Sequence, residues 1–239
     1  MTAVQLPLPW KTRTPAGSQA LTIGTHTYEL HIARHRRARR YVLRVTADGA
    51  LRLTVPIRSS IEGGVTFARR QETWIERERV RQLARSAPWR AGTTILFRGE
   101  GVTLTMADGV VMCGSERIVV RRAHDDLRPV VEAHLLATAA RELPPRLAEL
   151  ATPLSLSVAR VAVRNQRSRW GACSAKGTIT LNWRLIQMPP PVSDYVILHE
   201  LMHLKQLNHS RRFWRAVADA CPHWRDAERW IRRHGREIL

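Results

Sequence analysis

The first half of the chain carries apolar and polar residues in alternation, in short segments that suit half-buried strands. Three of these segments follow one another, at 21–32, 40–46 and 50–56. The tripeptide Ala-Asp-Gly at 47–49 separates the last two, and its turn chemistry predicts a β-hairpin. Two more strand-like segments, at 94–106 and 116–122, are separated by glycine-containing turns. This half is therefore predicted to be rich in β-structure.

One segment in the first half changes to helical spacing. Residues 59–86 read as a single helix. Its expected apolar stripe consists of Phe67, Trp74, Ile75, Val80 and Leu83.

After about residue 122 helices and strands mix. Residues 126–150 have a helical pattern, with a break expected at Pro144 and Pro145. Strands are predicted at 157–165 and 177–186, and helices from Ser193 to the end, interrupted near Asn208 and Pro222. We therefore expect an α+β fold in three parts. They are a flexible, Pro-, Thr-, Gly- and Ser-rich arm at 1–20, a β-rich subdomain with a long helix at 21–122, and an α+β domain at 123–239.

The segment VILHELMHLKQLNHSRRFW, residues 196–214, gathers the strongest candidate chemistry. It holds three of the chain's 10 histidines, His199, His203 and His209. A helix from about Asp194 to Leu207, with Ser193 as its N-cap, would put the first two one turn apart on one face. Their imidazoles could then converge on one metal ion.

Glu200 lies about 100° around this helix from His199, close enough to reach a water on the ion without ligating it. This is the H-E-x-x-H arrangement of zinc hydrolases. The alternative is a pair of ordinary surface histidines. The neighbouring residues argue against it, because the helix is apolar nearly all round and burying these polar groups without partners would be costly. The pattern therefore favours a catalytic metal.

A zinc hydrolase usually supplies three protein ligands and leaves one position open. His209 lies beyond the reach of a straight helix, so we expect the chain to turn back. Asn208 could supply a left-handed residue there, and Ser210 could cap the next helix. Glu228 and His223 remain rival third ligands.

Composition adds a strong positive charge. The chain has 39 Lys and Arg against 20 Asp and Glu, a formal net charge of +19. Such a surface attracts anions, including nucleic acid, although surplus surface arginine explains the excess equally well because it runs along the whole chain. Cys113, Cys173 and Cys221 form no C-x-x-C pair, which argues against a disulfide framework or a cysteine zinc site. No signal peptide or membrane span is evident, so we expect a cytoplasmic protein.

Several segments resemble the YgjP-like family of metal-dependent hydrolases, relatives of the SprT-like zinc metallopeptidases. The matching stretches are SRWGACSAKGTITLNWRLI, DYVILHELMHLKQLNHSRRFW, the late CPHWRDAERWI, the arginine-rich HRRARRYVLRV and the helical RRQETWI. The chain departs from its relatives at Ala172, where serine is common. The metzincins share the histidine spacing but need a later Met-turn, and no Met follows Met202.

The resemblance implies a zincin-like C-terminal metallopeptidase domain with one Zn²⁺ on His199, His203 and His209, and with Glu200 as catalytic acid/base. Arg167 and Arg169 are candidate substrate residues, since paired guanidinium groups can hold a carboxylate or phosphate. For the family positions Trp170, Gly171, Cys173 and Asn182, turn and packing roles compete with substrate contact. We retain Asn182 among the candidates.

Three functions follow as hypotheses. The first is a zinc metallopeptidase in which Glu200 is the general base for a zinc-activated water, with a peptide or protein substrate lying along an edge strand formed by TITLN, residues 178–182. The second is a nucleoside triphosphate pyrophosphatase at the same site, although no phosphate-binding glycine motif is present. The third is a nucleic-acid-binding protein with a structural metal, which the lack of cysteine ligands disfavours. The sequence does not indicate an oligomeric state.

Overall fold

The structure is a computed structural model, and it describes residues 17–46, 48–120 and 125–238. It contains both helices and sheets, so the predicted α+β class is confirmed. Packing divides the chain into two compact units between Ala87 and Pro88. We call the described residues before this point the N-terminal unit and those after it the C-terminal unit. The predicted arm at 1–20 lies mostly outside the described residues.

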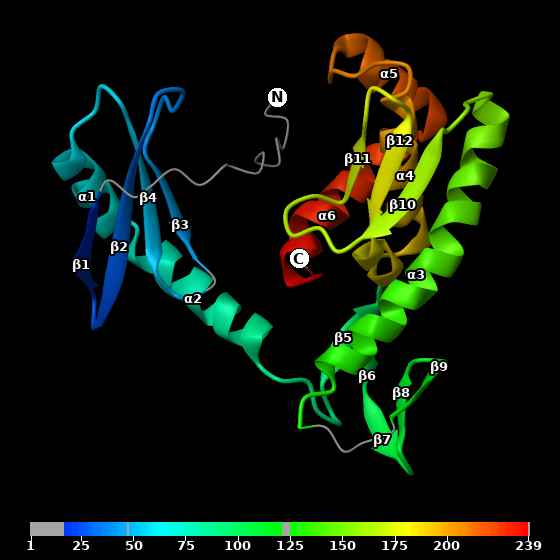
Figure 1. The fold of residues 1–239 in the computed structure, drawn as a ribbon, viewed down its shortest axis with the longest axis horizontal. Coiled ribbons are helices and arrows are strands. Elements are labelled where there is room, and N and C mark those ends of the chain that lie inside the picture. The colour runs from blue at the N-terminus through cyan, green and yellow to red at the C-terminus, as the bar shows by residue number, and fades with distance from the viewer. Residues whose placement is uncertain (1–16, 47, 121–124, 239) are drawn as a thin grey trace. The chain divides into compact units, whose positions relative to one another are not determined.

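The N-terminal unit is built on a four-stranded sheet (Figure 1). Its strands are β1 (Gly17–Ile23), β2 (His26–His35), β3 (Val42–Val45) and β4 (Leu51–Pro56), in the order β1-β2-β4-β3. β2 and β4 are parallel, and the two outer pairs are antiparallel. The predicted hairpin before β4 is present, because Val42–Val45 pairs with Leu51–Thr54 and Gly49 adopts a positive φ of 85°. Leu30, Leu51 and Leu53 are fully buried, as their alternation predicts.

The helix predicted at 59–86 is two helices, α1 (Ile61–Arg69) and α2 (Glu72–Ser86). The chain breaks at Arg70 and Gln71, where the Arg70 N–H turns back to main-chain oxygens of the previous turn. Ala68, before the break, and Ile75, after it, both reach the core of the sheet.

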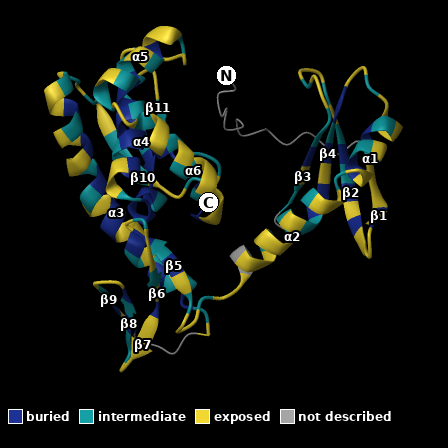
Figure 2. Cartoon of the chain, turned by 180° about the vertical axis from the view of Figure 1, so that it is seen from behind, coloured by how far each residue is buried: buried dark blue, intermediate teal, exposed yellow. Residues whose placement is uncertain are grey.

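The expected apolar stripe along this helix is only partly correct. Phe67 and Trp74 pack against the core of the N-terminal unit and Ile75 is fully buried. Val80 and Leu83 are 54% and 58% exposed, on the largely exposed second half of α2 (Figure 2). Gln82, seven residues after Ile75, turns toward the sheet and donates to the Thr46 carbonyl. The face of α2 that carries Ile75 and Gln82 is thus the one on the sheet, and Val80 and Leu83 lie off that face.

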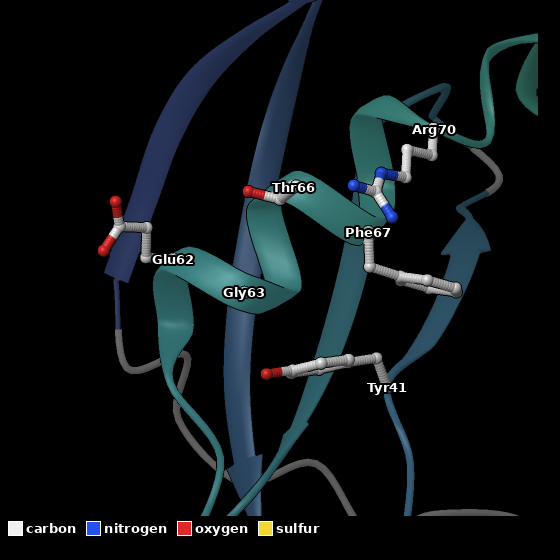
Figure 3. A pocket seen from close by; sticks show the side chains of 6 residues that line it. All are labelled: Tyr41, Glu62, Gly63, Thr66, Phe67 and Arg70. Atoms are coloured by element: carbon white, nitrogen blue, oxygen red, sulfur yellow. The ribbon is translucent and has the colours of Figure 1, made fainter.

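An open pocket of about 520 Å³ lies between α1 and the segment before β3 (Figure 3). Tyr41 and Phe67 stack there with ring centroids 5.9 Å apart, and the Tyr41 hydroxyl donates to the Ser60 carbonyl. The charged residues of the pocket, Glu62 and Arg70, are exposed. The pocket therefore contains no buried charged group, and its stacked rings serve packing between the helix and the sheet.

The C-terminal unit begins with five short strands. These are β5 (Thr94–Phe97), β6 (Glu100–Thr103), β7 (Thr105–Ala107), β8 (Val110–Cys113) and β9 (Glu116–Val119). We expected them to lie with the N-terminal half, with a boundary near residue 122. Their buried residues, including Phe97, Val111 and Ile118, instead belong to the same hydrophobic core as the later helices.

The rest of the C-terminal unit surrounds a three-stranded sheet of order β10-β12-β11 (Figure 1). Its elements are α3 (Arg128–Ala151), the 3-10 turn η1 (Thr152–Leu154), β10 (Arg160–Arg164), β11 (Gly171–Cys173), β12 (Thr178–Asn182), the 3-10 turn η2 (Trp183–Gln187), α4 (Pro190–Met202), α5 (Arg211–Ala220) and α6 (Trp224–Ile238). α4 packs against α3, α5, α6 and β11. The predicted break at Pro144 and Pro145 is wrong, since α3 runs through both prolines and buries Leu143 and Leu147. No helix in the described ranges is long and apolar enough to cross a membrane.

Asn182, at the end of β12, holds the segment that leads into β11. Its side chain is fully buried, with 0% of its surface exposed. Its Nδ2 donates to the carbonyl oxygens of Gln166 at 2.7 Å and Arg169 at 2.9 Å, and its Oδ1 accepts from the Arg184 N–H at 3.1 Å. All of the amide's main hydrogen-bonding groups are used inside the protein, which leaves none for a substrate.

Replacing Asn182 with Asp should destabilise the C-terminal unit strongly. The carboxylate cannot donate to two buried carbonyl oxygens, and we expect the free energy of unfolding to fall by about 2–4 kcal/mol. Urea unfolding at neutral pH measures this loss.

Asn165→Asp is the matched control. The side chain of Asn165 is exposed, and its Oδ1 accepts a hydrogen bond from the Arg184 guanidinium. A carboxylate can still accept there, so we expect a change within about 0.5 kcal/mol. Equal losses at the two positions would contradict the role given to the Asn182 amide.

Candidate metal centre

Helix α4 carries the first two histidines and starts earlier than predicted. It begins at Pro190, with Pro189 as N-cap, because proline needs no hydrogen-bond acceptor in the first turn and its φ already suits a helix. Ser193 is buried within the helix and does not cap it, so that prediction is wrong. His199 lies in the last turn, and His203 is the C-cap. The two rings are 5.0 Å apart between centroids.

A tight turn brings His209 back to the same place. The main chain closes this turn with short-range hydrogen bonds, from the Leu204 N–H to Leu201 and from the Gln206 N–H to Met202. Asn208 does not have a positive φ, so the prediction of a left-handed residue there is wrong. The short-range hydrogen bonds of the turn reverse the chain instead. Ser210 caps α5 as predicted, with its Oγ accepting from the Phe213 N–H at 3.4 Å.

The three imidazoles converge on one small volume. The centroid of His209 lies 5.1 Å from that of His199 and 4.8 Å from that of His203. One potential ligand atom from each ring lies within 4.8 Å of the other two. The Nε2 atoms of His199 and His209 are 3.1 Å apart. Two nitrogens bound to a tetrahedral ion at 2.0–2.1 Å are about 3.3 Å apart, so this spacing suits a shared ion.

Their surroundings keep these histidines neutral. Burial lowers the pKa of His199 to about 3, and the neighbouring His203 and His209 add to the shift. Burial also lowers the pKa values of His203 and His209. The Nδ1 of His203 lies 3.0 Å from the Gln206 carbonyl oxygen, so that nitrogen carries the hydrogen and leaves Nε2 with a free lone pair. Neutral imidazoles with free lone pairs are suitable ligands for zinc.

Glu200 directly follows His199 on α4 and is buried. Only 6% of its surface is exposed, and no hydrogen bond from the described residues reaches its carboxylate. Burial raises the pKa of Glu200 to about 8, and the positive charge of Arg169 opposes the shift. A buried carboxyl group without a hydrogen-bond partner is costly, and such groups are concentrated at functional sites.

The rival third ligands lie elsewhere. Glu228 is on α6, where its carboxylate pairs with the Arg232 guanidinium at 2.6 Å. His223 is exposed between α5 and α6. The described residues contain one cluster of potential metal ligands, and its third member is His209.

The candidate substrate residues differ in their burial and in their contacts. Arg169 is half-buried and close enough to Glu200 to lower its pKa, whereas Arg167 is exposed. Asn182 is buried and occupied by the hydrogen bonds described above, and this geometry gives no support to a substrate contact.

Two aromatic residues of α5 also surround the histidines, and we did not single them out from the sequence. The Phe213 ring stacks on His203 with centroids 4.5 Å apart, and the Trp214 ring stacks on His209 at 5.8 Å. Their positions three and four residues after the cap Ser210 place them on the first turn of α5, which faces the histidines. Their spacing from the cap Ser210 was the sequence feature that could have placed them beside the histidines.

Comparison with known proteins identifies the chain. The model of the YgjP-like family, described as a metallopeptidase domain, matches residues 39–234. No curated protein matches the sequence. A solved structure, the metallopeptidase zymogen of Pyrococcus abyssi abylysin, is 26% identical over 40% of this chain and 98% of that chain, with a TM-score of 0.36. Because the family match spans most of the sequence, the protein belongs to the YgjP-like family and is a metal-dependent hydrolase.

Proposed function

We propose that the protein is a zinc metallopeptidase that cleaves peptide bonds with Glu200 as general base. The observation that carries this proposal is the convergence of three imidazoles on one small volume, together with a buried carboxyl group directly after the first of them that receives no hydrogen bond from the described residues. A structural zinc site has no need for such a carboxyl group. A hydrolase needs it to take up and return a proton.

His199, His203 and His209 would hold the ion. Zinc there would supply a Lewis acid that makes water more acidic and polarises the scissile carbonyl. Glu200 accepts the proton of the attacking water and delivers it to the leaving nitrogen. The raised pKa of Glu200 suits both transfers near neutral pH. Arg169, nearby and half-buried, is a candidate partner for a substrate carbonyl or carboxylate.

The sheet offers one edge beside Glu200, and it is not the strand we expected. β12, which contains TITLN, is the central strand and pairs with β10 and β11 on its two sides. It therefore cannot accept a substrate strand, and the prediction is wrong. Both β10 and β11 are edge strands of this sheet, and β11 is the one that packs closely against α4.

The main chain of β11 is arranged to receive a peptide. The Asn182 N–H donates to the Trp170 carbonyl, and the Ser174 N–H donates to the Thr178 carbonyl. Along an antiparallel strand, residues whose main-chain N–H and C=O groups face the partner strand alternate with residues whose groups face away from it. Trp170 and Ser174 face β12, so the N–H and C=O groups of Gly171 and Cys173 point away from it. A substrate in an extended conformation could pair with these groups. This edge favours a peptide over a nucleotide.

Glu200→Gln tests the general base. We expect bound zinc to remain near one ion per chain, because Glu200 is not a ligand, and kcat on casein-derived peptides to fall by about 10²–10⁴-fold. Metal analysis and peptide cleavage are measured on the same preparation, with nucleoside triphosphates assayed in parallel. A fully active variant would remove Glu200 from the mechanism, and loss of triphosphate hydrolysis alone would favour the phosphoanhydride alternative.

His209→Ala tests the third ligand. Removing one of three imidazoles should weaken zinc retention by more than about 100-fold, since losing even an outer partner of a metal ligand costs 10–100-fold. Dialysis against a graded zinc buffer measures it. His223→Ala and Glu228→Gln are controls and should retain the metal. Zinc loss in either control, with retention in the His209 variant, would reassign the ligand.

A scan of N-methylated peptides tests the substrate edge. Methylation removes one substrate N–H at a time, so binding to β11 should weaken at every second position near the scissile bond. We expect KM to rise by about tenfold or more at the sensitive positions and to change little between them. Sensitivity without this alternation would contradict strand addition.

A further inference from the structure

Gly171 lies in β11, and its backbone does not require glycine. The glycines with positive φ in this protein are found elsewhere, so the conformation of Gly171 is open to other residues. Its main chain is regularly paired, opposite Leu181 of β12. Glycine in a strand loses more conformational entropy on folding than alanine and contributes no side chain to packing. Another constraint must explain its presence.

That constraint is Glu200. A Cβ atom added at Gly171 would lie 2.5 Å from Cγ of Glu200, 2.7 Å from its Oε1 and 2.8 Å from its Cδ. All three distances are shorter than carbon–carbon or carbon–oxygen contact allows. The side chain of Glu200 therefore lies directly against the glycine, with its carboxylate in the space that a side chain would fill.

Neither partner can easily yield. Glu200 is nearly fully buried, and its neighbours Leu198 and Leu201 on α4 are buried as well. Because Cγ itself is among the atoms contacted, rotation of the terminal carboxylate alone would not relieve the overlap. Relief requires the whole side chain to rotate about its Cα–Cβ bond, or β11 to move away from β12. Rotation moves the carboxylate out of its present place, and movement of the strand removes the surface against which the carboxylate lies.

We propose that Gly171 is a positioning residue that, by lacking a side chain, sets the location of the Glu200 carboxylate against β11. The proposal rests on the proposed function, in which that carboxylate is the general base. Gly171 itself performs no proton transfer. It acts through the space it leaves open.

The chain offers a matched control for this idea. Gly101, in β6 of the same unit, also lacks a positive φ. A Cβ there would lie 3.4 Å from the Thr94 Cγ2, which is an ordinary contact. Gly101→Ala should thus be neutral or slightly stabilising, since alanine reduces the freedom of the unfolded chain.

The first arm of the test measures catalysis. Gly171→Ala should lower kcat on a casein-derived peptide by about 10²-fold, the effect of displacing a catalytic group by about 1 Å. KM and bound zinc should stay within about twofold, because substrate edge and ligands are retained. Gly101→Ala should leave kcat unchanged. A Gly171→Ala enzyme with the kcat of the wild type, or one whose loss lies only in KM or zinc content, would overturn the proposal.

The second arm does not depend on activity. In protein stripped of metal with a chelator, Gly171→Ala should lower Tm by about 2–10 °C through overpacking. In a Glu200→Ala background the overlapping atoms are gone, so the same substitution should cost nothing or raise Tm slightly. Equal destabilisation in the two backgrounds would show that the added methyl group clashes with something other than Glu200.

The two arms separate the proposal from the function on which it rests. If Glu200→Gln is fully active, the general-base assignment fails whatever Gly171→Ala does. The Tm comparison then still decides whether Gly171 and Glu200 compete for the same space. If Glu200→Gln is inactive while Gly171→Ala keeps the wild-type kcat, the function stands and the positioning role is removed.

Discussion

The cost of burying polar groups in an apolar helix is the constraint on which this structure depends. α4 is buried on nearly every side, yet it carries His199 and Glu200 in its last turn. Burial raises the pKa of the Glu200 carboxyl and lowers that of the His199 imidazole, so both groups are held there by the surrounding fold against the cost of their burial. The same burial gives the imidazoles free lone pairs and the carboxyl group a proton affinity near neutrality. The feature that costs stability is thus the one that supplies the chemistry.

The fold meets this cost by fixing the site from several directions. α3 and α6 cover α4, and the tight turn after His203 returns His209 to the other two rings. Phe213 and Trp214 then stack on the histidines and limit their rotation. On the remaining side β11 lies against Glu200, held by its pairing with β12 and by the Asn182 side chain. Each of these elements helps to position the histidines and Glu200, which all come from one short segment of the chain.

The short-range parts of this arrangement could be predicted from sequence. The spacing of His199, His203 and His209 predicted the cluster that the geometry brings together, and Ser210 predicted the start of α5. The long-range parts could not. Strand order places β12 in the centre, and nothing in the alternation of TITLN distinguishes a central from an edge strand. Nor did helical spacing show that Val80 and Leu83 have no core to face. The contact between Gly171 and Glu200 joins residues far apart in the sequence, so only the folded structure reveals it.

The C-terminal helix has a consequence for the strand that lies against Glu200. Gly235 on α6 lies against the indole of Trp170, since a Cβ there would be 3.1 Å from the Trp170 Cζ2. Trp170 immediately precedes β11, so this indole links the packing of α6 to the position of that strand. A larger side chain at position 235 would push against the indole, and a change on a helix that carries no reactive group would then be felt at the strand.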